Sequence, residues 1–350
     1  MAKAITVLPS KKKVVWFYQS NPNPFDLNET KQWERYSDFE NDYIEEAYQR
    51  KEQEVHLNDY VIDFTHQIQY KTNEKDKQRP IKRGDISLSQ YVRAERFSYP
   101  EKAISFNISD DYFSAFIERW RDQNKGICKP DEDDQWSAIA EQAAQGKDFQ
   151  TRFVTLQQIL IFTGILKEGK LLNQDFDAQR MAKQLMQCRD SMQLQECAAR
   201  LYSAESFLYK LVNSSLRNEV MSKANTLGPF CYILWMYLRF GMDNALETVY
   251  RGTTLTLEMI NEYKRAVGRN IQFPAFTSTS KRIDIAERFG NTLFIIKLSF
   301  GQNANNISHL SYYPNEEEVL LRANYQFTIE EVKTRPGSDK VLIYLRETSF

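Results

Sequence analysis

The spacing of apolar residues changes along the chain, and this change most constrains the fold. Over residues 151–167, 175–189 and 203–217, and over 133–146, apolar side chains recur every three or four positions. This spacing predicts amphipathic helices. From residue 247, β-branched and aromatic residues alternate with polar ones, which predicts strands over 247–250, 271–276, 292–300, 318–321, 326–333 and 341–346. We therefore predict an α+β domain with its helices first and its sheet after them.

A smaller unit precedes that domain. Short aromatic-rich strands are predicted over residues 14–18, 32–36, 60–64 and 67–70, around one helix over 41–48 that Asn41 could cap. This composition indicates a small, half-open β-sheet with one helix. The mixed polar stretch after it ends in an acidic turn at residues 129–134. We predict an N-terminal domain over 12–90, a linker over 91–132 and a second domain over 133–350.

Charge, cysteine and histidine content exclude several classes of protein. Across 350 residues, 46 Lys and Arg balance 47 Asp and Glu, so no net positive field favours direct nucleic-acid binding. The cysteines (128, 188, 197 and 231) show no CxxC spacing and no signal peptide is evident, which predicts an intracellular protein of the cytoplasm or nucleus. Three scattered histidines argue against a metal site. The apolar segment 227–238 is too short to cross a membrane and predicts a buried helix.

Three short pieces of the second domain carry residues suited to chemistry. Arg251 precedes Gly252 at a strand end, where a guanidinium can hold a phosphate and a glycine allows close approach to the backbone. Ser278, Thr279 and Ser280 end another strand. Glu316 and Glu318 open a third, and in an extended chain they project from one face, with Glu317 on the other. Crowding of two carboxylates should raise and couple their pKa values.

Taken in this order, the pieces resemble the R-S-E signature of the arginine-specific mono-ADP-ribosyltransferases. The resemblance covers about residues 135–335 and extends to flanking residues, namely Arg200, Leu201, Tyr202, Ser203, Phe273, Pro274, Ala275, Phe276, Thr277, Ala286, Phe289, Ser311, Tyr312, Tyr313 and Pro314. The H-Y-E pattern of poly-ADP-ribose polymerases is absent, because no histidine occupies the first strand position. The resemblance implies a transferase fold with a helical N-terminal half and a split β-sandwich that binds NAD.

The resemblance also implies the residues that handle NAD⁺, the co-substrate. Glu318 would stabilise the oxocarbenium-like ribose and hydrogen-bond its 2′-hydroxyl, with Ser278 steadying the carboxylate. The implied NAD-binding set is Arg251, Gly252, Ser278, Thr279, Ser280 and Phe289, of which Arg251 would anchor a phosphate or ribose, the Gly252 backbone the carboxamide, and Phe289 the nicotinamide ring.

The acceptor implied by the E-x-E pair is arginine on an acceptor protein. Glu316 would orient and deprotonate its guanidinium, whose pKa is far above neutrality, and Tyr313 would help to present it. Two other functions remain open: an NAD⁺ glycohydrolase with water as acceptor, and an inactive ADP-ribose-binding adaptor.

The N-terminal unit resembles a WWE domain, with Trp16, Trp33 and Glu45 at the naming positions. Buried aromatic residues of a small sheet would account for most of the pattern. In WWE domains that read poly-ADP-ribose, aromatic residues stack on adenine while a glutamine and an arginine bind ribose and phosphate. The matching positions are Tyr18, Trp33, Tyr60, Gln69 and Arg79, and the stretch 71–83 that contains Arg79 has six basic residues. The resemblance implies binding of ADP-ribosylated proteins or poly-ADP-ribose, with protein binding alone as the alternative.

Overall fold

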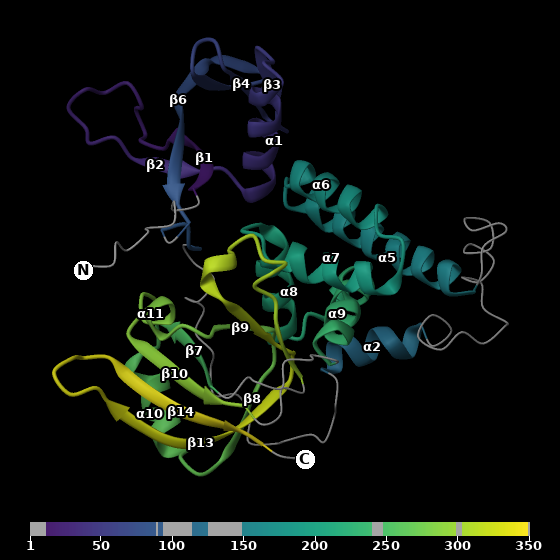
Figure 1. Cartoon of the computed structure of the whole chain (residues 1–350), viewed down its shortest axis with the longest axis vertical. Helices are drawn as coiled ribbons and strands as arrows, with labels where there is room; N and C mark the ends of the chain where they lie inside the picture. Colours follow the sequence, from purple (N-terminus) through teal and green to yellow (C-terminus); the bar gives the residue numbers. More distant parts are fainter. Residues whose placement is uncertain are drawn as a thin grey trace, which may run out of the picture.

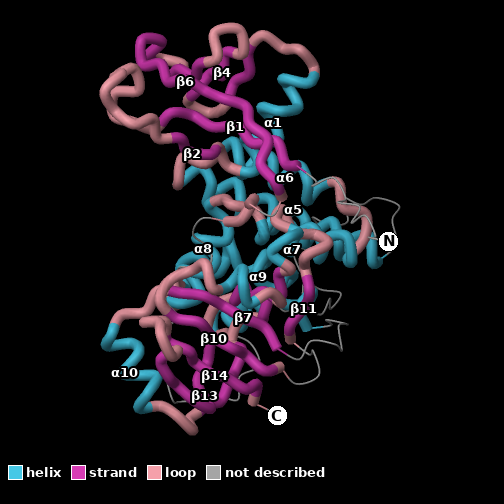
Figure 2. Tube along the Cα trace, turned by 60° about the vertical axis from the view of Figure 1, so that its left-hand side comes forward, coloured by secondary structure: helices cyan, strands magenta, loops and turns pink. Residues whose placement is uncertain are grey.

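The computed structural model describes residues 12–88, 90–93, 114–124, 149–239, 248–298 and 303–348, and the side chains from residue 155 onward in the helix that begins at 149. The N-terminal module, the helices and the C-terminal sheet follow one another along the long axis of the molecule (Figure 1). Figure 2 shows the helices of residues 149–239 as a layer between two groups of strands. The helix predicted over 133–146 and the turn at 129–134 lie outside the described residues.

The N-terminal module is a sheet with one helix against it, as predicted. Its elements are β1 (Lys12–Gln19), β2 (Trp33–Arg35), α1 (Asp38–Gln49), β3 (Glu54–His56), β4 (Tyr60–Asp63), β5 (Ile68–Lys71) and β6 (Glu74–Ser87). Within the described residues the strands form an antiparallel sheet in the order β2-β1-β6-β5-β4-β3. The sequence did not predict β3 or the long β6, because most residues of β6 are exposed and charged and lack an alternating apolar pattern.

Helix α1 begins earlier than predicted, and Asn41 is not its cap. Ser37 caps it, accepting from the backbone of Glu40, whose side chain accepts from the backbone of Ser37 in return. Asn41 lies inside the helix and accepts a 2.7 Å hydrogen bond from the backbone of Trp16. Trp16 also donates its indole nitrogen to Glu45 at 2.8 Å, which fixes the helix to β1.

The helical half of the second domain packs around one large core. Its elements are α2 (Ala115–Gln123), α5 (Phe149–Leu171), α6 (Asp175–Met186), α7 (Ser191–Ser203), α8 (Phe207–Arg217), the 3₁₀ helix η1 (Met221–Lys223) and α9 (Ala224–Arg239). Gly228 in α9 allows α2 to approach, because a β-carbon there would lie 2.5 Å from the Trp120 ring. Part of the predicted linker therefore packs as helix α2 in this core. Within the described residues no helix is both long and apolar enough to cross a bilayer.

The C-terminal half is a mixed sheet that carries the three predicted motifs. Its elements are β7 (Thr248–Thr253), α10 (Leu257–Arg265), β8 (Asn270–Phe273), β9 (Thr277–Ser280), α11 (Ile283–Ala286), β10 (Thr292–Lys297), β11 (Ala304–Asn306), η2 (Pro314–Glu316), β12 (Glu318–Leu321), β13 (Tyr325–Thr334) and β14 (Val341–Glu347). The order over the described strands is β11-β12-β9-β7-β10-β14-β13-β8, with β10 and β14 parallel. Strands β7 and β9 pair at Tyr250 and Ser280, and this short join divides the sheet into two parts, as a split sandwich requires.

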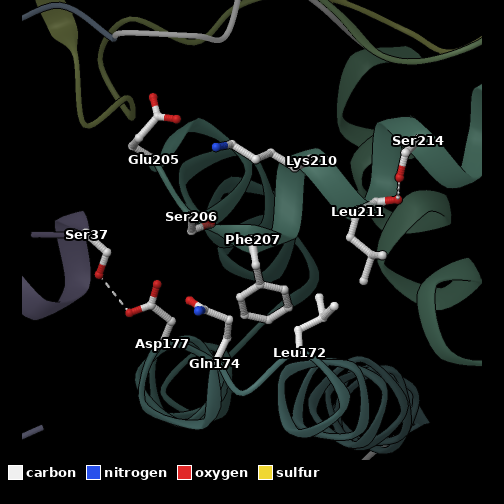
Figure 3. A pocket seen from close by; sticks show the side chains of 10 residues that line it. All are labelled: Ser37, Leu172, Gln174, Asp177, Glu205, Ser206, Phe207, Lys210, Leu211 and Ser214. Atoms are coloured by element: carbon white, nitrogen blue, oxygen red, sulfur yellow. Dashed lines mark hydrogen bonds between the residues drawn. The ribbon is translucent and has the colours of Figure 1, made fainter. Parts of the chain in front are cut away.

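The N-terminal module rests on the helical layer through a junction rich in carboxylates. Ser37 donates to Asp177 at 2.8 Å, and Asp38 accepts from the backbone of Glu205 at 2.7 Å. Beside them lies a pocket of about 560 Å³ whose lining residues come from both the module and the helices (Figure 3). Burial, and then the charge of Glu40, raise the pKa of Asp177 from 3.8 to about 8.

This pKa shift predicts that stability falls as the pH rises from about 4 to about 8. Folded Asp177 retains a proton that the unfolded chain releases, so its stabilising contribution is present below pH 3.8 and is lost as the pH passes the folded pKa of about 8. We expect Asp177→Asn to reduce this loss by on the order of 3 kcal/mol. Urea unfolding at pH 5 and pH 8.5 measures it. Asp175→Asn on the same helix is the control, and a pH dependence of Asp177→Asn equal to that of wild type would disprove the shift.

Candidate active site

The two glutamates of the E-x-E motif converge, but not through an extended chain. Glu316 ends the 3₁₀ helix η2, and Glu317 adopts a left-handed conformation with φ of 45° before Glu318 opens β12. The expectation of an extended backbone was therefore wrong. The chain leaves the 3₁₀ helix at Glu316 and changes direction at Glu317 before β12 begins. Both carboxylates are nevertheless buried with no exposed surface, while Glu317 is exposed.

A third charged side chain, Arg93, lies between these carboxylates. Its Nε donates to Glu316 Oε2 at 2.7 Å, its backbone N–H to Glu316 Oε1 at 2.8 Å, and its Nη2 to Glu318 Oε2 at 2.5 Å. Its Nη1 lies 3.5 Å from Glu318 Oε1 and 3.3 Å from the carbonyl oxygen of Ser203. The guanidinium is fully buried, so this is a desolvated pairing of one cation with two anions.

Burial and charge act in opposite directions on these groups. Desolvation raises the pKa of Glu316, as does the neighbouring charge of Glu318, while Arg93 lowers it, and the net direction is upward. For Arg93, desolvation disfavours the charged form, but the two carboxylates together raise its pKa well above the ordinary value. The guanidinium therefore stays charged, and Glu316 is a carboxylate with raised proton affinity.

Strand β9 supports the glutamates mainly through Ser280. Ser280 is directly opposite Glu318 in the antiparallel register, and its hydroxyl donates to the backbone oxygen of Glu316 at 2.6 Å. Thr279 donates to the Val319 carbonyl at 2.6 Å. Ser278, expected to steady Glu318, is opposite Leu320 and lies two residues from Ser280 on the same strand face.

The arginine and glycine of β7 are both buried beside this strand. Arg251 Nη1 donates to the carbonyl oxygen of Ser278 at 2.9 Å, so the first and second motifs are in contact. At Gly252, a β-carbon would lie 1.9 Å from the Ala286 carbonyl oxygen and 2.6 Å from that of Phe289. Glycine is thus required here because the end of α11 and the residues that follow it lie close to the strand backbone.

Phe289 and Tyr313 pack against the residues that precede Arg93. Phe289 is 7% exposed and forms a small apolar cluster with Ile285 and Val92. Tyr313 stacks on Tyr91 with ring centroids 4.7 Å apart and an interplanar angle of 11°. The Arg93 guanidinium lies 5.0 Å from the Tyr313 ring centroid.

Sequence reasoning missed Tyr91, Val92 and Arg93 altogether. They lie in the polar stretch interpreted as a linker, and no local motif distinguishes Arg93 from other arginines of the chain. The Arg200 to Ser203 piece of the resemblance has a structural place: Ser203 accepts from the backbone N–H of Tyr312 at 3.0 Å, and the Arg200 guanidinium lies 4.3 Å from the Tyr312 ring. This piece joins α7 to the segment that carries the glutamates.

In the N-terminal module, four of the five expected ligand residues share one sheet face. The register places Gln69 opposite Arg79 and Ile62, and it places Tyr18 opposite Ile81, so strand alternation brings Tyr18, Tyr60, Gln69 and Arg79 to the same side. Trp33 is opposite Gln19 and projects from the other side, where Lys82 lies 4.1 Å from its ring.

Tyr36, which the sequence did not single out, joins the group on the first face. Its hydroxyl donates to Gln69 at 2.6 Å, and its ring centroid is 5.3 Å from that of Tyr18. Arg79 Nη1 donates to the backbone oxygens of Gln19 and Asn21 at 2.9 and 2.7 Å. The arginine is thereby held beside the tyrosines.

Comparison with known proteins gives two family matches. The model of the NAD:arginine ADP-ribosyltransferases matches residues 169–349, and that of the WWE domain matches residues 14–83. The NAD(P)(+)–arginine ADP-ribosyltransferase 2 of Gallus gallus is 32% identical over 160 residues, which are 43% of this chain and 48% of that protein. The T-cell ecto-ADP-ribosyltransferase 1 of Mus musculus is 32% identical over 135 residues, 37% of this chain and 43% of that one. The chain thus spans about half the length of these relatives.

Among solved structures, the ADP-ribosyltransferase HopU1 of Pseudomonas syringae pv. tomato is similar to this chain with a TM-score of 0.40 and 27% identity, covering 45% of this chain and 77% of that one. The family match covers residues 169–349 of the 350 and includes all three motifs. The chain carries an N-terminal WWE domain and belongs to the NAD:arginine ADP-ribosyltransferase family.

Proposed function

We propose that this protein transfers a single ADP-ribose from NAD⁺ to an arginine side chain of an acceptor protein and releases nicotinamide. One observation carries the proposal: the two buried carboxylates of the E-x-E motif hold a guanidinium, that of Arg93, in a closed site. A pair that binds one arginine in this way has the charge and hydrogen-bonding geometry to bind another. The names of the relatives from Gallus gallus include the same acceptor.

In the proposed reaction, the bond between nicotinamide and ribose breaks while a guanidine nitrogen of the acceptor bonds to the anomeric carbon. Positive charge develops on the ribose, and the Glu318 carboxylate stabilises it without solvent competition because the side chain is buried. Glu316 takes the proton that the guanidinium loses. Its raised pKa makes it a better proton acceptor than an exposed glutamate.

The NAD⁺-binding roles rest on the family resemblance together with the placement of the motifs. Arg251 contacts the strand that contains Ser278, Thr279 and Ser280, and Ser280 of this strand is opposite Glu318. We assign a phosphate or ribose to Arg251, the carboxamide to the Gly252 backbone and the nicotinamide ring to Phe289. No metal is part of this proposal, since the charge stabilisation comes from Glu318.

The experiment that tests the function uses labelled NAD⁺ and an arginine-rich protein. Label on the protein that arginine-specific chemistry can remove supports the proposal. Free ADP-ribose alone would make the protein a glycohydrolase, because water would then be the acceptor. Absence of either product, with NAD⁺ still bound, would make it an adaptor. The presence of the guanidinium-binding Glu316 favours transfer over both alternatives.

We further propose that the WWE domain binds ADP-ribose units and brings the enzyme to targets that are already modified, which raises their effective concentration. Tyr18, Tyr36 and Tyr60 would contact adenine, Gln69 the ribose and Arg79 a phosphate. A charged hydrogen bond to phosphate contributes about 1.5–3 kcal/mol. Its loss is a roughly tenfold or larger change in affinity.

We therefore expect Arg79→Ala in the full chain to weaken binding of iso-ADP-ribose by about tenfold or more, as measured by calorimetry. Lys77→Ala removes a neighbouring exposed cation of β6 and serves as the control. Equal affinity of the two variants, with unchanged melting temperatures, would exclude Arg79 from the binding site. If wild type itself does not bind, the module is a protein-binding unit.

A further inference from the structure

The residues that connect the WWE domain to the rest of the chain enter the active site. Tyr91, Val92 and Arg93, here called the strap, follow β6 closely, and Tyr91 and Arg93 are 3% and 1% exposed. The strap lies outside both matched family models, which end at residue 83 and begin at residue 169. Neither matched family model therefore includes the strap.

Arg93 occupies the carboxylate oxygens of Glu316 and Glu318 that the proposed reaction needs. Both oxygens of Glu316 accept from it, at 2.8 and 2.7 Å, and Glu318 accepts at 2.5 Å from Nη2. The carboxylate that should stabilise a developing positive charge is thus already neutralised by a guanidinium. While Arg93 is seated, an acceptor arginine cannot reach Glu316, and a ribose hydroxyl must displace Nη2 to reach Glu318.

Val92 covers the other half of the site. It packs against Phe289 and Ile285, and Phe289 is the residue to which we assign the nicotinamide ring. The strap therefore occupies the places of both substrates, with an apolar side chain on the nicotinamide side and a guanidinium on the acceptor side.

Residues of the WWE domain hold the strap in place. The Tyr91 hydroxyl donates to Asp38 at 2.6 Å, and the Arg35 guanidinium lies 5.2 Å from the Tyr91 ring and donates to the Val92 carbonyl oxygen at 3.3 Å. Tyr313 stacks on Tyr91 and also donates to Asp38, at 3.3 Å. Asp38 opens helix α1, so the strap is held between this helix and the catalytic glutamates.

We propose that the strap is an intramolecular pseudosubstrate: Arg93 occupies the acceptor-arginine subsite and Val92 the nicotinamide subsite, so the enzyme is closed until the strap leaves. This inference rests on the proposed function. Withdrawal of Arg93 alone would leave two buried carboxylates without the guanidinium that pairs with both of them, which is costly. Substrates therefore compete with the strap by replacing its charge, and the rate depends on the fraction of molecules in which the strap is open.

The test compares wild type, Arg93→Ala and Arg50→Ala as full chains, with NAD⁺ and agmatine as a small guanidine acceptor. Arg50 pairs with Glu52 on the surface of the same domain, so its variant removes an arginine without touching the strap. We expect Arg93→Ala to raise kcat/KM for NAD⁺ by about tenfold or more and to lower KM for agmatine. Without Arg93 the strap no longer closes the site, so a larger fraction of the molecules can bind both substrates. Arg50→Ala should match wild type.

Tyr91→Ala provides a second variant that leaves all three charges in place and loosens only the anchor of the strap. It should also raise kcat/KM, and it decides the question if Arg93→Ala fails to fold. Hydrogen exchange adds a readout besides activity: the backbone amide of Arg93 should be protected in wild type and exchange faster in Tyr91→Ala, or with saturating NAD⁺ and agmatine.

The outcomes separate the strap from the proposed function. If folded variants and wild type are active with equal kcat/KM, the strap does not close the site, while the function stands. If none of the proteins turns over NAD⁺, the function fails, and the strap proposal fails with it. ADP-ribosylation of Arg93 at a rate independent of protein concentration would show that Arg93 is modified within its own molecule. Arg93 would then be a substrate and not an inhibitor, which would also overturn the proposal.

Discussion

Glu318→Gln should lower the rate of nicotinamide release by about 10²-fold or more, the scale usual for loss of a main electrostatic stabiliser. Glutamine retains the size and hydrogen-bonding oxygen of the side chain but not the charge that opposes the cationic ribose. The side chain is buried, so no water can substitute for that charge. Because the change also weakens the contact with Arg93, NAD⁺ binding should be undiminished.

Single-turnover release of nicotinamide measures the chemical step, and calorimetry measures NAD⁺ binding separately. Glu317→Gln is a closely matched control, since it makes the same substitution one residue earlier on an exposed side chain. Glu317→Gln should retain the wild-type rate. Near-normal turnover of Glu318→Gln would show that Glu318 is not the catalytic residue. Another group would then have to stabilise the ribose cation.

Glu316→Gln should abolish transfer to arginine while hydrolysis of NAD⁺ continues. In the structure Glu316 accepts from both the Nε and the backbone N–H of Arg93. A glutamine there would turn an amide donor toward a guanidinium that has only donors, and it could not take up the proton. Attack by water requires neither guanidinium binding nor proton uptake by Glu316. Hydrolysis continues because Glu318 still stabilises the ribose cation. The expected transfer defect is about 10²-fold or more, the upper part of general-base effects.

Label on agmatine and free ADP-ribose, measured in the same reaction, give the ratio of transfer to hydrolysis. That ratio should collapse in Glu316→Gln and stay unchanged in Glu317→Gln. Parallel loss of both products would mean that Glu316 is needed for NAD⁺ cleavage itself. Undiminished transfer would show that the acceptor is bound elsewhere, and the arginine assignment would lose its structural support.

The sequence predicted that Glu316 and Glu318 lie together, but it could not have predicted that Arg93 lies between them. Glu316 lies 223 residues away along the chain, and the contact forms only because the WWE domain and the catalytic domain pack together. The same holds for Asp38, which joins Tyr91, Tyr313 and the backbone of Glu205 across the junction. Charge pairing over such separations leaves no periodic signal in the sequence.

Local backbone geometry around the motifs also required the structure. The E-x-E spacing suggested an extended chain, whereas Glu317 adopts a left-handed conformation that turns both neighbours inward. Similarly, the strand register brings Ser280 opposite Glu318, although Ser278 was the serine that resemblance suggested. Register depends on hydrogen bonds with a strand remote in sequence, so the motif alone cannot specify it.

By itself the sequence determined the type and order of most elements, because apolar spacing selects which face of a helix or strand is buried. Helices α6 and α8 and strand β12 lie where that spacing predicted them. It also determined the family, because the arginine, serine and glutamate motifs are local and specific. Only the tertiary structure decided what lies between the two glutamates: the buried carboxylates need a cation, and the fold supplies Arg93 from the segment that joins the two domains.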